Sequence, residues 1–152
     1  MRAPAKVVAC DDHLLIGELL SVVVDDIDGL EFAGAAADGR EAVELVGRTS
    51  ANVLVLDLDM PGHDGLYALR RIRQFNDDVW IIVYSGMVTS KARGEVIDAG
   101  ADHIVRKDDT LDSLEQALLA ARDRPPRRPS QRFSRPARPT KAAAAGGRSA
   151  KP

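Results

Sequence analysis

The sequence predicts an α/β protein in which five parallel strands alternate with five helices. Short apolar runs begin near residues 6, 30, 53, 79 and 103, and a segment with helical spacing of apolar residues follows each run. The strands are apolar throughout rather than alternating, which is typical of a parallel sheet covered by helices on both faces. A content of 45% hydrophobic and 29% charged residues fits a globular protein.

The clearest strand is residues 79–84 ("VWIIVY"), where every side chain is β-branched or aromatic. The other expected strands are residues 6–10, 30–36, 53–56 and 103–105. The expected helices are residues 14–25, 40–48, 64–74, 91–99 and 111–121, and Gly100 is a suitable end for the fourth. Helical spacing predicts which side chains each helix buries, and for the first helix these are Leu15, Leu19, Val22 and Val23.

Right-handed crossovers place the C-terminal ends of all five strands at one edge of the sheet. We expect a flavodoxin-like, doubly wound (βα)5 sheet with strand order 2-1-3-4-5, whose site lies at that edge. Five side chains fall at the predicted strand ends and are called the strand-end site below: Asp11, Asp12, Asp57, Ser85 and Lys107.

The composition changes near residue 122, so we expect one domain over residues 1–122 and a tail over residues 123–152. Six of the eight prolines lie in this tail, which contains no Leu, Ile or Val, and we expect it to be disordered. Nine of the 21 basic residues, and no acidic residue, lie in residues 124–152. Residues 1–123 therefore carry 12 basic and 23 acidic residues. Contact between this basic tail and nucleic acid would be weak and nonspecific.

The single cysteine, Cys10, excludes an intrachain disulfide, and we expect its side chain to be buried at a strand end. No run of apolar residues is long enough to cross a membrane, and no secretion signal precedes the first carboxylates. We therefore expect a cytoplasmic protein without membrane contact.

Three neighbouring carboxylates repel each other unless a cation lies among them. Oxygen ligands with open positions for water suit Mg²⁺, which binds proteins through a few carboxylates together with a phosphate. A carboxylate can also attack phosphorus and form an aspartyl phosphate. In this interpretation one of the carboxylates is the nucleophile, and Ser85 and Lys107 could hold the phosphoryl oxygens.

Simpler roles exist for the same residues. Asp11 and Asp12 could cap the first helix, and Asp64 could cap the third. Asp59 could lie in the turn before Pro61 with its side chain in solvent, while Ser85 and Lys107 could be ordinary loop and surface residues. His13 and His63 are expected to be exposed loop residues without partners, and Trp80 and Tyr84 are expected to pack in or near the core.

Residues 4–122 resemble the response-regulator receiver domains of bacterial two-component systems. The segments "VVACDDHLLIGELL" and "ADGREAVELV" are similar to receivers joined to LuxR/NarL-type DNA-binding domains. The resemblance implies that Asp57, within "LDLDMPG", is the phosphoacceptor. It also implies that Asp11 and Asp12 bind Mg²⁺ together with Asp57 and the backbone carbonyl of Asp59, and that Ser85 and Lys107 contact the phosphoryl group.

Two positions depart from the family pattern. Gly86 replaces the usual alanine after the switch hydroxyl, and "GADHIVRK" places Ile104 at the position where an aromatic residue usually acts in the switch. The expected partners are a sensor histidine kinase and a downstream protein target, or a second copy of the chain. The output partner would bind through the surface formed by the fourth helix, the fifth strand and the fifth helix.

Two other functions fit parts of the pattern. The chain could be the receiver part of a DNA-binding transcriptional regulator. The helix-turn-helix of that regulator would then be absent from this chain, since no such pattern is present within it. The Asp-x-Asp of "LDLDM" also resembles the start of haloacid-dehalogenase-type phosphatases. In those enzymes the acidic pair follows this motif, whereas here it precedes it, which favours a phosphoacceptor over an enzyme. A phosphoacceptor can still catalyse its own phosphorylation and dephosphorylation.

Overall fold

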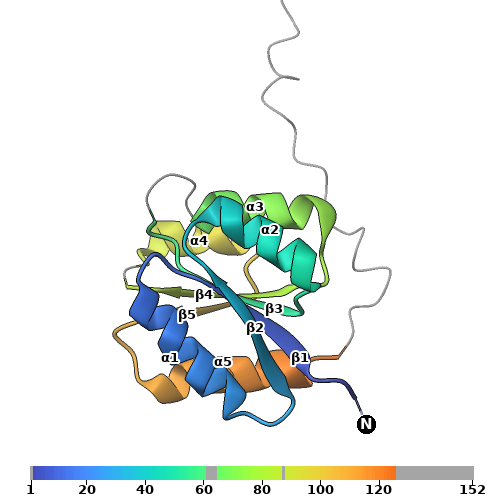
Figure 1. Cartoon of the computed structure of the whole chain (residues 1–152). Coiled ribbons are helices and arrows are strands. Elements are labelled where there is room, and N and C mark those ends of the chain that lie inside the picture. Colours follow the sequence, from blue (N-terminus) through green and yellow to red (C-terminus); the bar gives the residue numbers. More distant parts are fainter. Residues whose placement is uncertain (1, 61–64, 87, 126–152) are drawn as a thin grey trace, which may run out of the picture.

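Five parallel strands form one sheet in the order β2-β1-β3-β4-β5 in the computed structural model, which describes residues 2–60, 65–86 and 88–125 (Figure 1). The strands are β1 (Ala5–Cys10), β2 (Leu30–Ala36), β3 (Val53–Leu56), β4 (Trp80–Ser85) and β5 (His103–Arg106). The helices are α1 (Leu14–Asp25), α2 (Gly39–Thr49), α3 (Gly65–Phe75), α4 (Ser90–Ala99) and α5 (Leu111–Asp123). The predicted fold class and strand order are confirmed.

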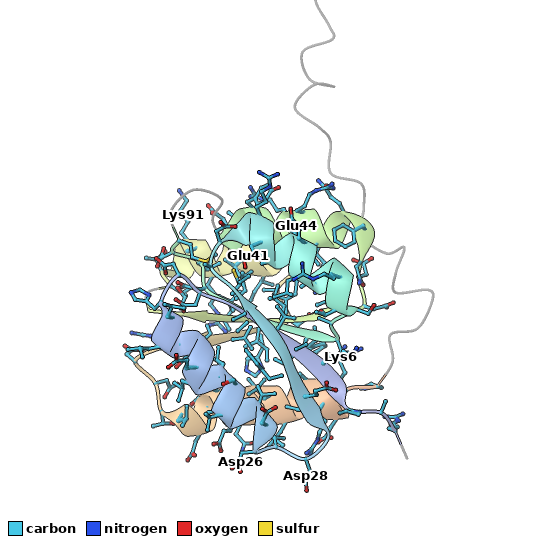
Figure 2. The ribbon with its side chains drawn as sticks, in the orientation of Figure 1. Lys6, Asp26, Asp28, Glu41, Glu44 and Lys91 are labelled. Atoms are coloured by element: carbon cyan, nitrogen blue, oxygen red, sulfur yellow. The ribbon has the colours of Figure 1, made fainter. Side chains whose placement is uncertain are left out.

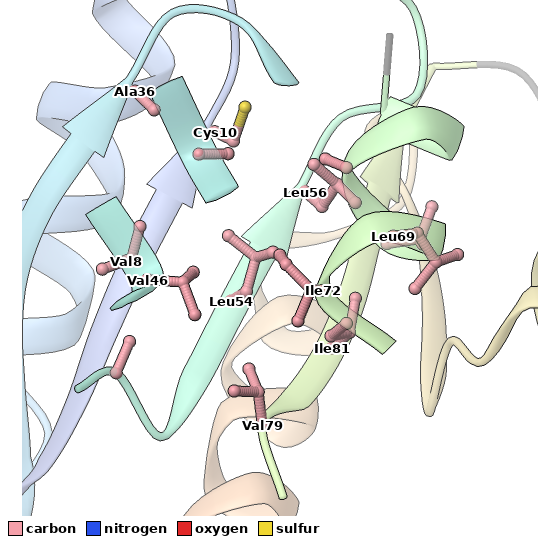
Figure 3. Packing of buried hydrophobic residues seen from close by; sticks show 14 of the residues in the cluster. Val8, Cys10, Ala36, Val46, Leu54, Leu56, Leu69, Ile72, Val79 and Ile81 are labelled. Carbon is pink, nitrogen blue, oxygen red and sulfur yellow. The ribbon is translucent and has the colours of Figure 1, made fainter. Parts of the chain in front are cut away.

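Helices cover both faces of the sheet, with α2, α3 and α4 on one side and α1 and α5 on the other (Figure 1). Each face has its own buried cluster. In the first, sheet residues such as Leu54 and Ile81 meet Val46, Leu69 and Ile72 from α2 and α3 (Figure 3). The second cluster includes Val7 and Val55 of the sheet, Leu20 and Val24 of α1, and Leu114 and Leu118 of α5. Burial on both faces explains why the strands are apolar throughout.

Local hydrogen bonds set several helix ends. Asp38 accepts a hydrogen bond from the backbone N–H of Glu41 at 2.8 Å, and the Glu41 carboxylate accepts one from the N–H of Ala37 at 3.0 Å. Thr89 caps α4 through the N–H of Ala92. Gly100 ends α4 with a φ of 119°, a left-handed conformation that glycine adopts without strain.

The predicted buried face of α1 is wrong for three of its four residues. Leu15 is 76% exposed, Val22 69% and Leu19 37%, whereas Leu20 is 1% exposed and Val24 is fully buried. The segment "LLIGELLSVVV" is apolar at nearly every position, so its periodicity does not select one face. In α5, helical spacing aligns Leu111, Leu114, Leu118 and Ala121 on one face. The last three are buried, whereas Leu111 is 43% exposed.

The far end of α5 is anchored to the edge of the sheet opposite the strand-end site. The Arg124 guanidinium donates hydrogen bonds to the carbonyls of Asn52 and Asp78 and lies 5.4 Å from the centre of the Trp80 ring. The structure thus describes contacts between the sheet and residues past position 122. The expected disorder of the tail and its nucleic-acid contact concern residues 126–152, which lie outside the described residues.

Among the helices that the structure describes, none combines the length and the apolar character needed to span a lipid bilayer.

The corrected face of α1 can be tested by a pair of leucine truncations. Leu20→Ala should lower the free energy of unfolding by about 2–5 kcal/mol, because it leaves a cavity in the core. Leu15→Ala should change it by about 0.5 kcal/mol or less, because that side chain is exposed. Urea unfolding measures both values. Equal losses for the two variants would contradict the packing of α1 described above.

Candidate functional site

Backbone hydrogen bonds between neighbouring strands bring the strand-end site together. The N–H of Asp11 donates to the Ala36 carbonyl at 3.0 Å, and the N–H of Asp57 donates to the Cys10 carbonyl at 2.9 Å. The N–H of Lys107 donates to the Ser85 carbonyl, also at 2.9 Å. These bonds extend the ladders of the sheet by one residue. They fix the backbone positions from which the functional side chains project.

Close packing of α3 against the end of β3 holds the backbone of Asp57. A Cβ atom on Gly65 would lie 2.0 Å from the Asp57 carbonyl oxygen and 2.7 Å from the Leu58 Cα, so only glycine fits there. The Gly65 N–H donates to the Leu58 carbonyl at 3.3 Å. The sequence analysis missed this position, although a glycine near the predicted start of a helix was a usable signal.

Lys107 connects the two buried carboxylates. Its Nζ lies 2.5 Å from Oδ2 of Asp11 and 3.5 Å from Oδ2 of Asp57. The side chains of Asp11 and Asp57 are only 3% and 4% exposed. The Lys107 ammonium also lies 5.9 Å from the centre of the Tyr84 ring. Lys107 is therefore a partly buried ion-pair partner rather than a solvated surface lysine.

The electrostatics of the site leave Asp57 only partly compensated. Burial, and then repulsion from Asp11, raise the pKa of Asp57, while Lys107 and the N–H of Asp59 act in the opposite direction. Burial alone would lower the pKa of Lys107. The hydrogen bond to Asp11 and the charges of Asp57 and Asp11 nevertheless raise the pKa of Lys107 above its ordinary value. These contacts thus favour the charged form of Lys107, whereas burial and the charge of Asp11 disfavour the ionised form of Asp57.

Asp12 and His13 form the outer part of the site. The Asp12 side chain is 31% exposed, and its Oδ1 lies 3.2 Å from Nδ1 of His13. The same Nδ1 lies 3.2 Å from Oδ1 of Asp11, so the expectation that His13 has no partner is wrong. The N-cap residue of α1 is His13, and the structure shows no side-chain capping bond there. Oδ1 of Asp11 instead accepts a hydrogen bond from the backbone N–H of this N-cap residue at 2.9 Å, so Asp11 does contact the start of α1.

Ser85 is fully buried, and its Oγ has no hydrogen-bond partner within the described part of the chain. Asp59 is exposed, as expected, while its N–H donates to Oδ1 of Asp57 at 3.3 Å. Cys10 is buried, also as expected, and burial followed by the charge of Asp38 raises the pKa of its thiol. Ile104 is half-buried against the α2–α3–α4 side of the core.

Trp80 and Tyr84 both pack in the cluster on the α1–α5 side of the sheet, as expected. His63 and Asp64, for which a loop position and a capping role were expected, lie outside the described residues.

The residues of the site suit a hard divalent cation, although Asp57 is not in its tightest cluster. Among the described residues, Asp11, Asp12 and His13 offer ligand atoms that lie within 4.8 Å of one another. Asp57 joins this group through Lys107, which stands between the two buried carboxylates. Carboxylate oxygens, one of them partly open to water, are the donors that Mg²⁺ prefers. The unpartnered Ser85 hydroxyl and the imbalance of negative charge also favour a charged ligand at this edge.

The poorly compensated negative charge of Asp57 should lower the free energy of unfolding when no metal is bound. A raised pKa means that folding favours the protonated carboxyl, so ionised Asp57 lowers stability as pH rises through that raised value. In EDTA at pH 7, Asp57→Asn should therefore raise the free energy of unfolding by about 1–3 kcal/mol. The gain should shrink on acidification, because Asp57 then protonates in both states.

Urea unfolding at several pH values measures this difference. The matched control is Asp26→Asn, at an exposed carboxylate at the far end of α1 (Figure 2). The electrostatic account fails if Asp57→Asn gives no gain at pH 7, or if its gain increases on acidification.

Comparison with known proteins agrees with this geometry. Residues 7–119 match the family of response regulator receiver domains. A protein-glutamate methylesterase/protein-glutamine glutaminase of Myxococcus xanthus is 36% identical over 110 residues, which are 72% of this chain and 32% of that protein. The nitrate/nitrite response regulator protein NarP of Escherichia coli is 32% identical over 117 residues, covering 77% of this chain and 54% of NarP.

A solved structure, the signal receiver domain of the response regulator NarL from Mycobacterium tuberculosis, superposes with a TM-score of 0.74 at 27% identity. The match covers 81% of this chain and all of that one. The chain spans between about a third and about half of the length of the two curated relatives described above. It belongs to the response regulator receiver domain family, the phosphoacceptor domains of two-component signalling.

Proposed function

We propose that Asp57 is the residue that accepts the phosphoryl group in this receiver. The observation that carries the proposal is the position of its buried carboxylate at the end of β3. There Lys107, which already holds Asp11, lies 3.5 Å away. Asp57 is the less tightly paired of the two buried carboxylates. The resemblance of "LDLDMPG" to the family's motif also supports the proposal. An ionised, poorly compensated carboxylate is suited to attack an electrophilic phosphorus.

In the proposed reaction an Oδ atom of Asp57 attacks phosphorus while the bond between phosphorus and the donor breaks. When the donor is a phosphohistidine, the electron pair of the broken P–N bond returns to the imidazole, which leaves neutral after binding a proton. The Lys107 ammonium can then pair with a phosphoryl oxygen, and the Ser85 hydroxyl can donate the hydrogen bond that it lacks at present. Lys107 would thus add a phosphoryl contact to its ion pairs with Asp11 and Asp57, and Ser85 would gain a partner that it lacks within the described residues.

The carboxylates of Asp11, Asp12 and Asp57, with the backbone carbonyl of Asp59, are the proposed ligands of Mg²⁺. Bound there, the ion would neutralise charge on the transferring phosphoryl group. Lys107 holds Oδ2 of Asp11 at 2.5 Å, so the cation and Lys107 would share the Asp11 carboxylate.

The proposed phosphoryl donor is a sensor histidine kinase in the cytoplasm. Exposed apolar side chains of α1 begin directly after the acidic pair, with Leu14 85% and Leu15 76% exposed. They offer a contact surface for a donor protein beside the site. We propose that the chain is a phosphoacceptor rather than an enzyme that acts on other substrates, although it can promote its own phosphorylation and dephosphorylation.

The proposed output surface is formed by α4, β5 and α5, and a downstream protein or a second copy of the chain would bind it. Ile97 on α4 and Leu111 on α5 are 49% and 43% exposed there. Ile104 pairs with Val83 and packs against the core in place of the family's usual aromatic residue. Phosphorylation would change the relative populations of the conformations of this surface, and Ser85 would transmit the change. Membership of a longer, DNA-binding regulator is equally compatible with this arrangement.

The assignment of Asp57 predicts a simple result with a small-molecule donor. Acetyl phosphate with Mg²⁺ should add one phosphoryl group to the wild-type chain and to Asp26→Asn, and none to Asp57→Asn. Asparagine keeps the shape of the side chain but cannot act as the nucleophile. Intact-mass spectrometry measures the added group. Equal phosphorylation of Asp57→Asn and the wild-type chain would show that another residue is the acceptor.

A further inference from the structure

The outer face of α1 combines apolar and acidic side chains. Leu15, Leu19 and Val22 recur at helical spacing and are 76%, 37% and 69% exposed, so they form a stripe that faces solvent, called the α1 stripe below. Glu18 is exposed on the same face of the helix. Residues 7–39 contain eight acidic residues and no Lys or Arg. An apolar surface with a rim of one charge is typical of a docking site, and this one suits a partner that is basic and partly apolar.

The acidic end of α1 lies beside the end of α5. Nη1 of Arg122, in the last turn of α5, donates a hydrogen bond to the carbonyl of Asp28 at 2.8 Å. Asp26 and Asp28 project into solvent from the end of α1 and the loop after it (Figure 2). The described part of the chain ends at Pro125, three residues after Arg122. Residues 126–152 therefore begin close to the acidic end of α1.

The composition of residues 126–152 is complementary to this face. The segment contains eight Lys or Arg and no Asp or Glu, together with five prolines and one aromatic residue, Phe133. Its arginines can form charge-assisted hydrogen bonds with carboxylates such as those of Glu18 and Asp28. Its proline and phenylalanine rings can remove the α1 stripe from water. Both the charge and the apolar content of the segment thus match what the face lacks.

The segment is also long enough to cover the whole helix. At about 1.5 Å per residue, the 12 residues of α1 span about 18 Å. About six residues of extended proline-rich chain cover that distance, at about 3.1 Å each, and 27 residues follow Pro125. A tethered segment meets a nearby surface at an effective concentration in the millimolar range, so individually weak contacts are sufficient.

We propose that residues 126–152 dock on the α1 stripe, with their arginines paired with Glu18 and Asp28. The segment is then an autoinhibitory contact, because it covers the surface offered above to the donor protein. The inference rests on the proposed function only for this consequence. The docking itself requires neither Asp57 nor a phosphoryl group.

A nitroxide spin label at position 134 of the full chain tests the docking by NMR. Ser134→Cys supplies the attachment point, and Cys10 does not compete for the label because it is buried. The label should broaden the backbone amide signals of residues 15–28 and leave those of α4, on the other side of the sheet, unchanged (Figure 1). In 1 M NaCl the Debye length falls to about 3 Å, so the broadening should disappear.

Charge-removing variants of the labelled chain identify the surface that holds the segment. The double variant Glu18→Gln with Asp28→Asn should lose the broadening, because both substitutions remove a proposed partner of the arginines. The matched control is Glu95→Gln with Asp98→Asn, which removes two exposed carboxylates from α4 and should keep the broadening. Broadening that is absent from α1, spread evenly over the domain, or unchanged in Glu18→Gln with Asp28→Asn would overturn the proposal.

Two further measurements separate this inference from the alternatives. Broadening of α1 in labelled Asp57→Asn supports the docking whichever residue accepts the phosphoryl group. Phosphorylation of Asp57 by acetyl phosphate without broadening of α1 rejects the docking and leaves the proposed function intact, because acetyl phosphate needs no protein surface. If the signals of α1 stay sharp while a short DNA duplex binds the labelled chain at low salt, the segment binds nucleic acid instead, and the proposal fails.

Discussion

The ammonium group of Lys107 is the interaction on which the strand-end site depends. Strands β1 and β3 are parallel neighbours in the sheet, so their C-terminal ends lie side by side, about 4.8 Å apart. Two buried carboxylates at that spacing repel each other strongly. Lys107 reaches in from the end of β5 and contacts both, at 2.5 Å from Asp11 and 3.5 Å from Asp57. Without this shared cation the sheet order would place two like charges at its edge.

Lys107 compensates the negative charges of Asp11 and Asp57 unequally, and this difference suits a phosphoacceptor. Lys107 lies closer to Asp11, so Asp57 keeps a raised pKa because of its burial and its acidic neighbour. The fully buried hydroxyl of Ser85 has no partner within the described residues. Both features cost stability in the resting protein, and incoming charged groups can relieve both. The two buried clusters on either face of the sheet supply the stability that makes such a strained edge tolerable.

Hydrophobic patterning was sufficient to predict nearly all element boundaries, because strands such as Val53–Leu56 are apolar on both faces and end in polar residues. The strand order came from the doubly wound topology that such alternation favours, because the pattern itself carries no information on which strands are neighbours. The chain order of Asp11, Asp57 and Lys107 was sufficient to identify the receiver family, and the family match decides against the phosphatase alternative. The buried face of α1 could not be predicted, because apolar residues occupy nearly every position in that helix. The partners of His13 and the fit of Gly65 against the Asp57 carbonyl depend on tertiary distances that no local pattern encodes.

The most direct test of the account is to locate the phosphoryl group chemically. An acyl phosphate is reduced by borohydride to the corresponding alcohol, so a phosphorylated aspartate becomes homoserine and can be mapped by peptide mass spectrometry. After treatment with acetyl phosphate and Mg²⁺, the account predicts homoserine at position 57 alone. Homoserine at position 11, 12 or 59, with position 57 unmodified, would contradict the claim that the poorly compensated carboxylate at the end of β3 is the acceptor.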